Sequence, residues 1–427
     1  MLRFLAVIAV AHGLAPSFKT TISSSSNDWK QGVDEALTLL ALERGTAPAP
    51  DLAIVTVGLP LERHFEAIVD EIFERTRAQT LVGVVGAGVV GGGKERELQP
   101  CVAIAAGNLP SGSEVAPFTL SGDLKDPREY KETERLLRAS KACLLLGDPF
   151  SPITDAAALV DGWLPAAPVV GGLSCPASQE RPSIAIRTKG TTLATPPGTV
   201  AGLSFRGEHL EMHALTAQGA ISTGPIHAVT KTSTNHIILE LDDRPAIEAL
   251  RSTLAKTMEN DPRVAELLKS ALLIGLRPKG SDGAFLVWQV RGAGADGSLL
   301  VGDDTISEDT ECRFMVCDDV AARTDLHDTL KRYSLEKMFK GGGRPLLSVL
   351  VACGGRGEGL FKENGVDSAA IAAATSDAPC VGFFANGELG PVWARIPSAE
   401  DRIPTYLHGF TATCGVLVDT SGSSEEA

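Results

Sequence analysis

Short runs of β-branched and aliphatic residues alternate along the chain with longer stretches in which apolar residues recur at helical spacing. At 29–44 the apolar side chains fall at positions 33, 36, 37, 40 and 42, which predicts an amphipathic helix. Residues 52–57 (LAIVTV) form an apolar run bounded by Asp51 and Gly58, which is typical of a buried strand. A second helical stretch at 61–77 and a second apolar run at 81–85 follow. This order of strand, helix and strand predicts an α/β unit with parallel pairing.

The alternation continues through the rest of the chain. Further strands are expected at 101–106, 142–146, 168–170, 183–186, 237–241, 284–291, 312–317, 346–352, 381–386 and 411–418. Helices are expected at 245–258, where Pro245 suits the first turn, and at 325–338. The predicted fold class is α/β, with two mixed-sheet modules of layered helices and sheets that pack together in a sandwich-like way. The polar, acidic residues 419–427 are expected to form a flexible tail.

Composition and charge narrow the classes of function. The 427 residues include 39 Lys and Arg against 53 Asp and Glu, a formal net charge of −14. Because phosphate recognition needs a basic face, this balance argues against a nucleic-acid partner and against anionic membrane surfaces. Beyond the N-terminus no stretch holds the ~18 consecutive apolar residues of a membrane-spanning helix. The eight cysteines include no C-x-x-C pair and no histidine at ligand spacing, so we expect neither a metal site nor a cofactor.

The N-terminus has the composition of a targeting segment. Arg3 precedes an apolar run at 4–11 and small residues up to Ala15, which is the layout of a signal peptide. Residues 17–27 are rich in serine and no acid appears before Asp28, which is typical of organelle transit peptides. Residues 1–29 therefore resemble the two-part presequence of algae with secondary plastids. We predict plastid (chloroplast) targeting, with the secretory pathway as the alternative.

A glycine cluster at 86–93 follows the second predicted strand. Gly86, Gly88 and Gly91 match the G-x-G-x-x-G of dinucleotide-binding loops formally. That fingerprint also needs a helix directly after the glycines, whereas two further glycines at 92–93 disfavour a helix and 94–97 leads into another strand. A wide turn that packs closely against a neighbouring segment is the favoured interpretation.

The second half of the chain contains a stretch with reactive groups, LLSVLVACGGRG at 346–357. Its apolar strand places Cys353 at the C-terminal end, where α/β sheets bind ligands. Gly354, Gly355 and Gly357 leave the backbone around Arg356 free to turn N–H groups toward an anion, and the guanidinium suits a carboxylate. Near that cation the pKa of the Cys353 thiol would fall. A buried structural cysteine beside a turn is the alternative interpretation.

A second motif, ANGELG at 385–390, follows another predicted strand. It carries Asn386, Gly387 and Glu388. If the preceding strand lies in the centre of a sheet, the flanking glycines argue against a position of the Glu388 carboxylate on a solvent-exposed face. We expect Glu388 to pair with Arg356.

A third motif places His408 and Thr411 along a strand-like segment. His408 is either a structural histidine or a general base. Cys353, His408 and Glu388 together have the residue types of a nucleophile, a base and an orienting acid. A cysteine-dependent hydrolase or acyl-transfer enzyme is therefore an alternative function.

In order and spacing, these three motifs resemble the FIST family, whose paired modules are named for F-box and intracellular signal transduction proteins. The matching pieces are ACGGRG at 352–357, GFFANGELG at 382–390 and LHGFT at 407–411, with 81–97, 144–149 and 170–174 matching the N-terminal module. The resemblance implies a FIST N-terminal domain at 30–236 and a FIST C-terminal domain at 237–418. At the junction (QGAISTGP, 218–225) this chain has Ala220 where the family commonly has a cysteine.

The resemblance further implies modules that sense small molecules, amino acids among them. In relatives these modules are joined to an F-box or to output domains, but only about 50 residues precede the first predicted strand, too few for an F-box after the presequence. We therefore expect a stand-alone, non-catalytic sensor. A protein-interaction scaffold with an unknown protein partner is the third interpretation. The expected ligand-binding residues are Cys353, Gly354, Gly355, Arg356, Gly357, Asn386, Gly387, Glu388, His408 and Thr411.

Overall fold

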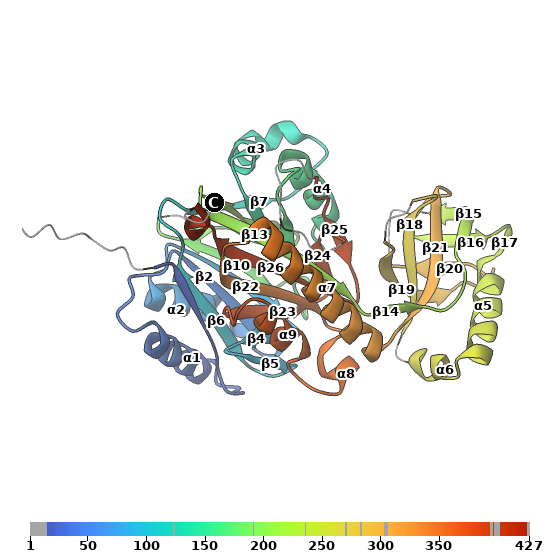
Figure 1. Cartoon of the computed structure of the whole chain (residues 1–427), viewed down its shortest axis with the longest axis horizontal. Helices are drawn as coiled ribbons and strands as arrows, with labels where there is room; N and C mark the ends of the chain where they lie inside the picture. Colours follow the sequence, from blue (N-terminus) through green and yellow to red (C-terminus); the bar gives the residue numbers. More distant parts are fainter. Residues whose placement is uncertain are drawn as a thin grey trace, which may run out of the picture.

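The computed structural model describes residues 15–122, 124–190, 192–234, 236–269, 271–281, 284–302, 306–392, 396 and 402–424. Its main body contains three six-stranded sheets, and a smaller barrel stands at one side (Figure 1). The α/β fold class is confirmed, because helices accompany mixed sheets throughout the body. Among the described residues, no helix is both long enough and apolar enough to cross a membrane.

The first sheet contains the early α/β unit. In order of hydrogen-bonded neighbours it runs through β1 (Ser17–Ile22), β6 (Val102–Asn108), β2 (Leu52–Gly58), β3 (Thr80–Gly86), β10 (Ile184–Thr188) and β11 (Thr192–Leu193). β2 and β3 are parallel, as the strand–helix–strand pattern predicts, and the other neighbours are antiparallel. The predicted helices appear as α1 (Trp29–Arg44) and α2 (Phe65–Thr76), the latter preceded by the 3₁₀ turn η1 (Leu59–His64). Both helices pack on one face of the sheet through buried side chains such as Val33 and Ile68.

The second sheet combines strands from both ends of the chain. It runs through β25 (Tyr406–His408), β24 (Glu388–Gly390), β9 (Val169–Leu173), β8 (Ala142–Gly147), β12 (Val200–Arg206) and β7 (Glu114–Leu120). Only β8 and β9 are parallel to each other within this sheet. Its helices are α3 (Lys131–Arg138), after the 3₁₀ turn η2 (Pro127–Tyr130), and α4 (Ile153–Trp163). α4 packs on the sheet through its apolar face, including Val160 and Trp163.

The third sheet holds the strand that carries Cys353. It runs through β13 (Leu210–Gln218), β26 (Thr411–Asp419), β22 (Arg344–Cys353), β23 (Cys380–Ala385), β4 (Gly88–Gly91) and β5 (Lys94–Glu97). β22 and β23 are parallel. The helices on this side are α7 (Asp319–Lys340), α8 (Gly357–Phe361) and α9 (Val366–Ala374). α7 begins at Asp318, whose Oδ1 accepts hydrogen bonds from the Val320 and Ala321 backbone N–H groups.

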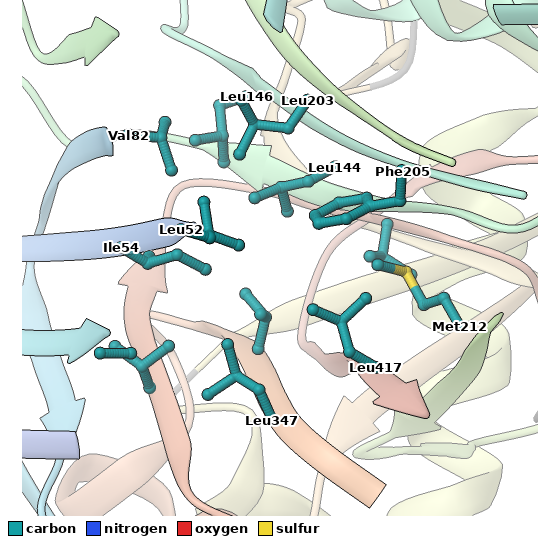
Figure 2. Close-up of a cluster of buried hydrophobic side chains, with 14 of the residues drawn as sticks. Leu52, Ile54, Val82, Leu144, Leu146, Leu203, Phe205, Met212, Leu347 and Leu417 are labelled. Carbon is teal, nitrogen blue, oxygen red and sulfur yellow. The ribbon is translucent and has the colours of Figure 1, made fainter. Parts of the chain in front are cut away.

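One apolar core lies where the inner faces of the three sheets meet (Figure 2). Leu52 and Ile54 come from the first sheet, Leu144 and Phe205 from the second, and Leu417 from the third. Strands from the two predicted modules are thus interleaved, since β4 and β5 extend a sheet that contains β22, β23 and β26. The predicted boundary near residue 236 divides the chain but does not divide these sheets.

The barrel is inserted between β13 and α7 (Figure 1). In order of hydrogen-bonded neighbours, the strands of the barrel are β21 (Thr310–Cys317), β15 (His227–Thr234), β16 (Ile237–Leu241), β20 (Leu299–Val301), β19 (Leu286–Ala293) and β18 (Leu272–Pro278). β18 also pairs with β21, which closes the ring. Shorter elements complete it: β14 (Ala220–Ser222), β17 (Arg244–Pro245), α5 (Ala246–Asn260) and α6 (Arg263–Leu267). The periodicity of the sequence predicts several of these strands but not their closure into a barrel.

Residues 17–29, which we predicted to belong to the presequence, are part of the fold. β1 pairs with β6 along its whole length, and Phe18 and Ile22 are buried. Asp28 caps α1, because its Oδ1 accepts a hydrogen bond from Lys30 N at 3.0 Å. The serine cluster at 23–26 forms the connection between β1 and α1, where Ser23 Oγ accepts a hydrogen bond from Val102 N at 3.0 Å. The predicted signal segment up to residue 14 lies outside the described residues, and plastid targeting stays a prediction.

The predicted flexible tail at 419–427 is wrong for its first residues, which are part of the fold. Asp419 ends β26, and its Oδ1 accepts hydrogen bonds from Ser421 N at 3.0 Å and Ser421 Oγ at 2.6 Å. A 3₁₀ turn, η3 (Ser421–Ser424), follows. Residues 425–427 lie outside the described residues.

The glycine cluster forms the hairpin of β4 and β5, with the turn at Gly92 and Gly93. This confirms the wide-turn interpretation, because a strand and not a helix follows the glycines. A Cβ atom on Gly88, the first residue of β4, would lie 2.8 Å from the Phe384 ring, so the hairpin approaches β23 more closely than a side chain would permit.

Candidate functional site

A cavity of about 360 Å³, here called the Cys353 cavity, lies between the main body and the barrel. Six of the ten predicted binding residues line it: Cys353, Gly354, Gly355, Asn386, Gly387 and His408. Gly409 and Phe410 extend this wall, and the barrel contributes Trp288, Gln289, Arg291 and Gly302. The three sequence motifs therefore do converge on one hollow, and the barrel closes its other side.

The body side of the cavity forms because β22 and β23 are parallel neighbours that end at the same edge of the sheet. Cys353 stands in register with Ala385, and Gly354 N donates to Ala385 O at 2.9 Å. Asn386 N then donates to Leu173 O at 3.0 Å, which ties the loop after β23 to the end of β9. The carboxyl ends of parallel strands are where α/β sheets bind ligands.

Arg356 lies behind the cavity, and its predicted pairing with Glu388 is wrong. The guanidinium is fully buried and makes a bidentate ion pair with Asp367, with Nε to Oδ2 and Nη2 to Oδ1 both at 2.8 Å. It also stacks over the Phe361 ring, 5.2 Å from the centroid. Asp367 was not expected as the partner, because it lies outside the three motifs and outside every element predicted from the sequence. Arg356 is a supporting residue of the loop and does not line the cavity.

The hairpin of β4 and β5 holds the segment that carries this ion pair. Glu95 accepts hydrogen bonds from Gly365 N and Ser368 N, both at 3.0 Å, and so caps the N-terminus of α9. Glu97 accepts from Glu358 N at 2.6 Å at the start of α8. Gly357 adopts a φ of 62°, and a Cβ there would lie 2.3 Å from Glu97 Oε1. Gly357 is thus required for close approach of this carboxylate and does not bind a ligand in the cavity.

Glu388 and Cys353 form a buried pair of a carboxyl group and a thiol. Glu388 Oε2 accepts hydrogen bonds from Thr411 N at 3.2 Å and Thr411 Oγ1 at 2.8 Å. The carboxyl lies close enough to the Cys353 thiol for each group to shift the pKa of the other. Its second oxygen, Oε1, has no hydrogen-bond partner in the part of the chain that the structure describes. Burial raises the pKa of Glu388 to about 8, although Thr411 and the Arg356 cation act in the opposite direction.

The Cys353 thiol is not acidified, contrary to our expectation. Burial, and then the charge of Glu388, raise the pKa of the thiol well above its ordinary value, and Arg356 opposes this shift without overcoming it. One backbone N–H group points at the sulfur, since Gly355 N lies 3.4 Å from Sγ. The thiol is therefore protonated at neutral pH but has a hydrogen-bond donor ready for an anionic sulfur.

His408 does not form a catalytic pair with Cys353. Its Nε2 donates to Gly390 O at 3.0 Å, and burial lowers the pKa of the ring to about 4, so the imidazole is neutral near pH 7. The Nδ1 atom is consequently an acceptor, and it has no hydrogen-bond partner among the described residues. The nucleophile–base–acid arrangement expected for a hydrolase is absent from this geometry.

The barrel supplies residues of the cavity wall that were not predicted from the sequence. Trp288 lines the cavity, and its Nε1–H, a donor only, is buried without a partner within the described ranges. Arg291 adds a permanent cation, and its side chain lies over Gly302, where a Cβ would be 3.4 Å from Nε. The only local signal was an aromatic residue and an arginine on a predicted strand, and nothing in it indicated that this strand faces the Cys353 motif.

The cysteines and acids show no sign of a metal centre. Within the described ranges no three His, Cys, Asp or Glu residues are grouped closely enough to hold a metal ion, and all eight cysteines are free. Cys175 is the only other cysteine that is not buried, and its Sγ donates to Phe384 O at 3.4 Å.

Comparison with known proteins agrees with this architecture. The FIST N domain model matches residues 51–244, and the FIST C domain model matches residues 246–391. The chain belongs to the FIST family. The two matches meet at β17, so the barrel and the interleaved sheets of this FIST protein each contain strands from both domains.

Two relatives span almost the whole FIST chain. An uncharacterized protein of Mycobacterium tuberculosis is 27% identical over 412 residues, which cover 93% of this chain and 98% of the relative. An uncharacterized protein of Mycobacterium bovis is 26% identical over 391 residues, covering 87% and 91%. These relatives extend the family but assign no activity to it.

The junction of the two predicted modules carries Ala220 where the family commonly has a cysteine. Ala220 lies opposite Cys317 in the pairing of β14 with β21.

Proposed function

We propose that this FIST protein is a non-catalytic sensor that binds a small organic acid, such as an amino acid, in the Cys353 cavity. The observation that carries this proposal is a complementary set of groups around one hollow. Trp288 Nε1 offers an unused donor, His408 Nδ1 an unused acceptor, and Arg291 a positive charge. A buried polar atom without a partner costs about 1–3 kcal/mol, which a ligand that pairs with it would recover.

These three protein groups define the chemistry of the ligand. A ligand carboxylate would accept a hydrogen bond from Trp288 Nε1 and pair with the Arg291 cation, and a ligand ammonium or hydroxyl group would donate a hydrogen bond to His408 Nδ1. An amino acid carries both groups on adjacent atoms. The volume of about 360 Å³ falls at the small end of ligand pockets, which favours a ligand of this size over a nucleotide.

Differential scanning fluorimetry with a panel of amino acids and small carboxylates tests this proposal, followed by calorimetric titration of any ligand that raises Tm. A ligand that binds the native state at 100 times its Kd stabilises it by about 2.7 kcal/mol. Arg291→Gln and Trp288→Phe should each weaken binding at least tenfold. Arg244→Gln, an exposed arginine on the same barrel, is the matched control and should leave Kd unchanged.

Two results would remove the proposal: a panel in which no compound shifts Tm, or a ligand whose Kd is the same in the wild type, Arg291→Gln and Trp288→Phe. The hydrolase alternative is not favoured, because neither ring nitrogen of His408 is hydrogen-bonded to the Cys353 thiol and burial lowers the pKa of the ring to about 4, which makes it a weak base. The scaffold interpretation has no observation in its favour among the described residues of the cavity.

A further inference from the structure

Four features of the Cys353 cavity are not explained by non-covalent binding of an acid alone. A thiol forms part of the cavity wall, and the Gly355 backbone N–H points at its sulfur. A carboxyl group lies near the thiol, because Glu388 binds Thr411 and the adjoining Ala412 stands in register with Ala352, next to Cys353. The fourth feature is Glu388 Oε1, which is fully buried and has no hydrogen-bond partner among the described residues. A purely structural cysteine needs none of these groups around it.

We propose that the cavity captures small acids that carry an aldehyde or 2-oxo carbonyl by reversible addition of the Cys353 thiol, with Glu388 moving the proton. This inference rests on the proposed function, because the same Arg291 would hold the carboxylate. It narrows the ligand class to carbonyl acids such as glyoxylate.

The reaction balances without an oxidant or a co-reactant. The ionised Glu388 carboxylate takes the S–H proton, and the sulfur forms a new bond to the carbonyl carbon. The π pair of the C=O bond moves to oxygen, which then takes the proton back from Glu388. The product is a hemithioacetal, and reversal of the same steps releases the ligand.

The site suits addition better than acyl transfer. Acyl transfer needs a base that can also protonate a leaving group, and His408 is a weak base, with its pKa lowered to about 4, that makes no hydrogen bond to the thiol. Addition needs only one group that accepts and returns a proton, and a carboxyl beside the thiol can do both. The Gly355 N–H donor stabilises negative charge on sulfur during the transfer.

Glycines beside the thiol leave room for the carbonyl to approach. A Cβ on Gly355 would lie 3.7 Å from Cys353 Sγ and 3.1 Å from the Phe410 ring, so a side chain there would occupy the space next to the sulfur. Gly354 has only Ala385 O within 4 Å of its Cβ position, at 3.5 Å. Both glycines line the cavity.

The test uses the full chain and two matched probes. [2-¹³C]Glyoxylate carries the carbonyl, and glycolate is the corresponding acid without it. We expect a new protein-bound ¹³C NMR resonance of a hemithioacetal carbon with glyoxylate. It should disappear in Cys353→Ser and persist in Cys175→Ser, in which the other cysteine that is not buried is removed. Glu388→Gln should slow formation of the adduct about 100-fold or more, as loss of a general base does.

The pH dependence of adduct formation provides a second measurement in case Glu388→Gln does not fold. Because the carboxylate is the reactive form, the rate in the wild type should rise roughly tenfold per pH unit below about pH 8 and level off above it. The groups that act electrostatically on Glu388 are Cys353, Cys175 and Arg356, and its cross-strand neighbour is His408. A rate independent of pH between 6 and 9 would overturn the role of Glu388.

The outcomes separate this inference from the proposed function. Equal Tm shifts with glyoxylate and glycolate, with no new resonance, would overturn covalent capture and leave acid binding intact. A resonance that persists in Cys353→Ser would overturn it as well. The absence of any Tm shift with either probe or with the wider panel would remove the proposed function itself.

Discussion

The buried ion pair between Arg356 and Asp367 allows a quantitative prediction. Both side chains are removed from water, with exposures of 0% and 2%, and they are joined by two hydrogen bonds of 2.8 Å. In Asp367→Asn the guanidinium loses its counter-charge while it stays buried. Removing one partner of a buried ion pair costs about 3–5 kcal/mol, mostly because the remaining charge is left uncompensated.

An exposed pair on neighbouring elements serves as the matched control. Arg323 and Glu363 lie 2.7 Å apart, but their side chains are 38% and 60% exposed. Glu363→Gln should therefore cost less than about 1 kcal/mol. The double variant Arg356→Met/Asp367→Leu should recover most of the stability lost in Asp367→Asn, because no buried charge remains.

Urea unfolding followed by far-UV circular dichroism measures these differences in the free energy of unfolding. Asp367→Asn should unfold at a clearly lower urea concentration than Glu363→Gln, with similar m-values if both unfold in the same way. If the two single variants lose the same stability to within about 0.5 kcal/mol, the buried pair is not stabilising the loop behind the Cys353 cavity, and the reasoning is refuted.

Three further predictions concern the edges and the centre of the fold. Removal of residues 1–14 should leave Tm unchanged, whereas removal of residues 1–24 should cost several kcal/mol, because Phe18 and Ile22 leave the core; equal melting of the two truncations would contradict this. The pKa of Glu388 is raised to about 8 in the folded protein, so its protonated form stabilises the fold at low pH and this contribution is lost as the pH rises from about 4.5 to about 8. Relative to Glu388→Gln, the wild type should therefore lose a few kcal/mol between pH 5 and pH 8.5 in urea unfolding, and parallel profiles would show that this carboxyl is not held protonated. Glu95→Ala should cost about 1–2 kcal/mol in thermal unfolding, since Gly365 N and Ser368 N lose their acceptor, while Glu66→Ala on the exposed side of α2 should have little effect.

Local patterns predicted the elements of this fold well and their arrangement poorly. The strand–helix–strand order correctly indicated the parallel pair of β2 and β3, and apolar runs marked β22, β23 and β26 within a few residues. Periodicity carries no information about which distant strands pair, so the joining of β4 and β5 to β23, and the closure of the barrel, were not predictable.

For the candidate site, too, local sequence patterns predicted some residues, but not the contacts that depend on the tertiary arrangement. Cys353 and Asn386, both among the predicted binding residues, lie on one cavity because β22 and β23 are parallel neighbours that end at the same edge, a pairing that was not predicted from the sequence. The partner of Arg356 was misassigned to the acid in the nearest glycine motif, whereas Asp367 lies at the start of a helix. Trp288 and Arg291 could not be found at all, because their place in the cavity depends on how the barrel sits against the body.

The pairing of β13 with β26 has a consequence for how the polypeptide is made. Residue 210 lies opposite residue 419, and β26 separates β13 from β22 within its sheet. During vectorial synthesis the ribosome must release nearly the entire chain before this sheet can be completed. Apolar edges of β13 and β22 would stay uncovered until then, so we expect the nascent protein to depend on chaperones until its last strand has emerged.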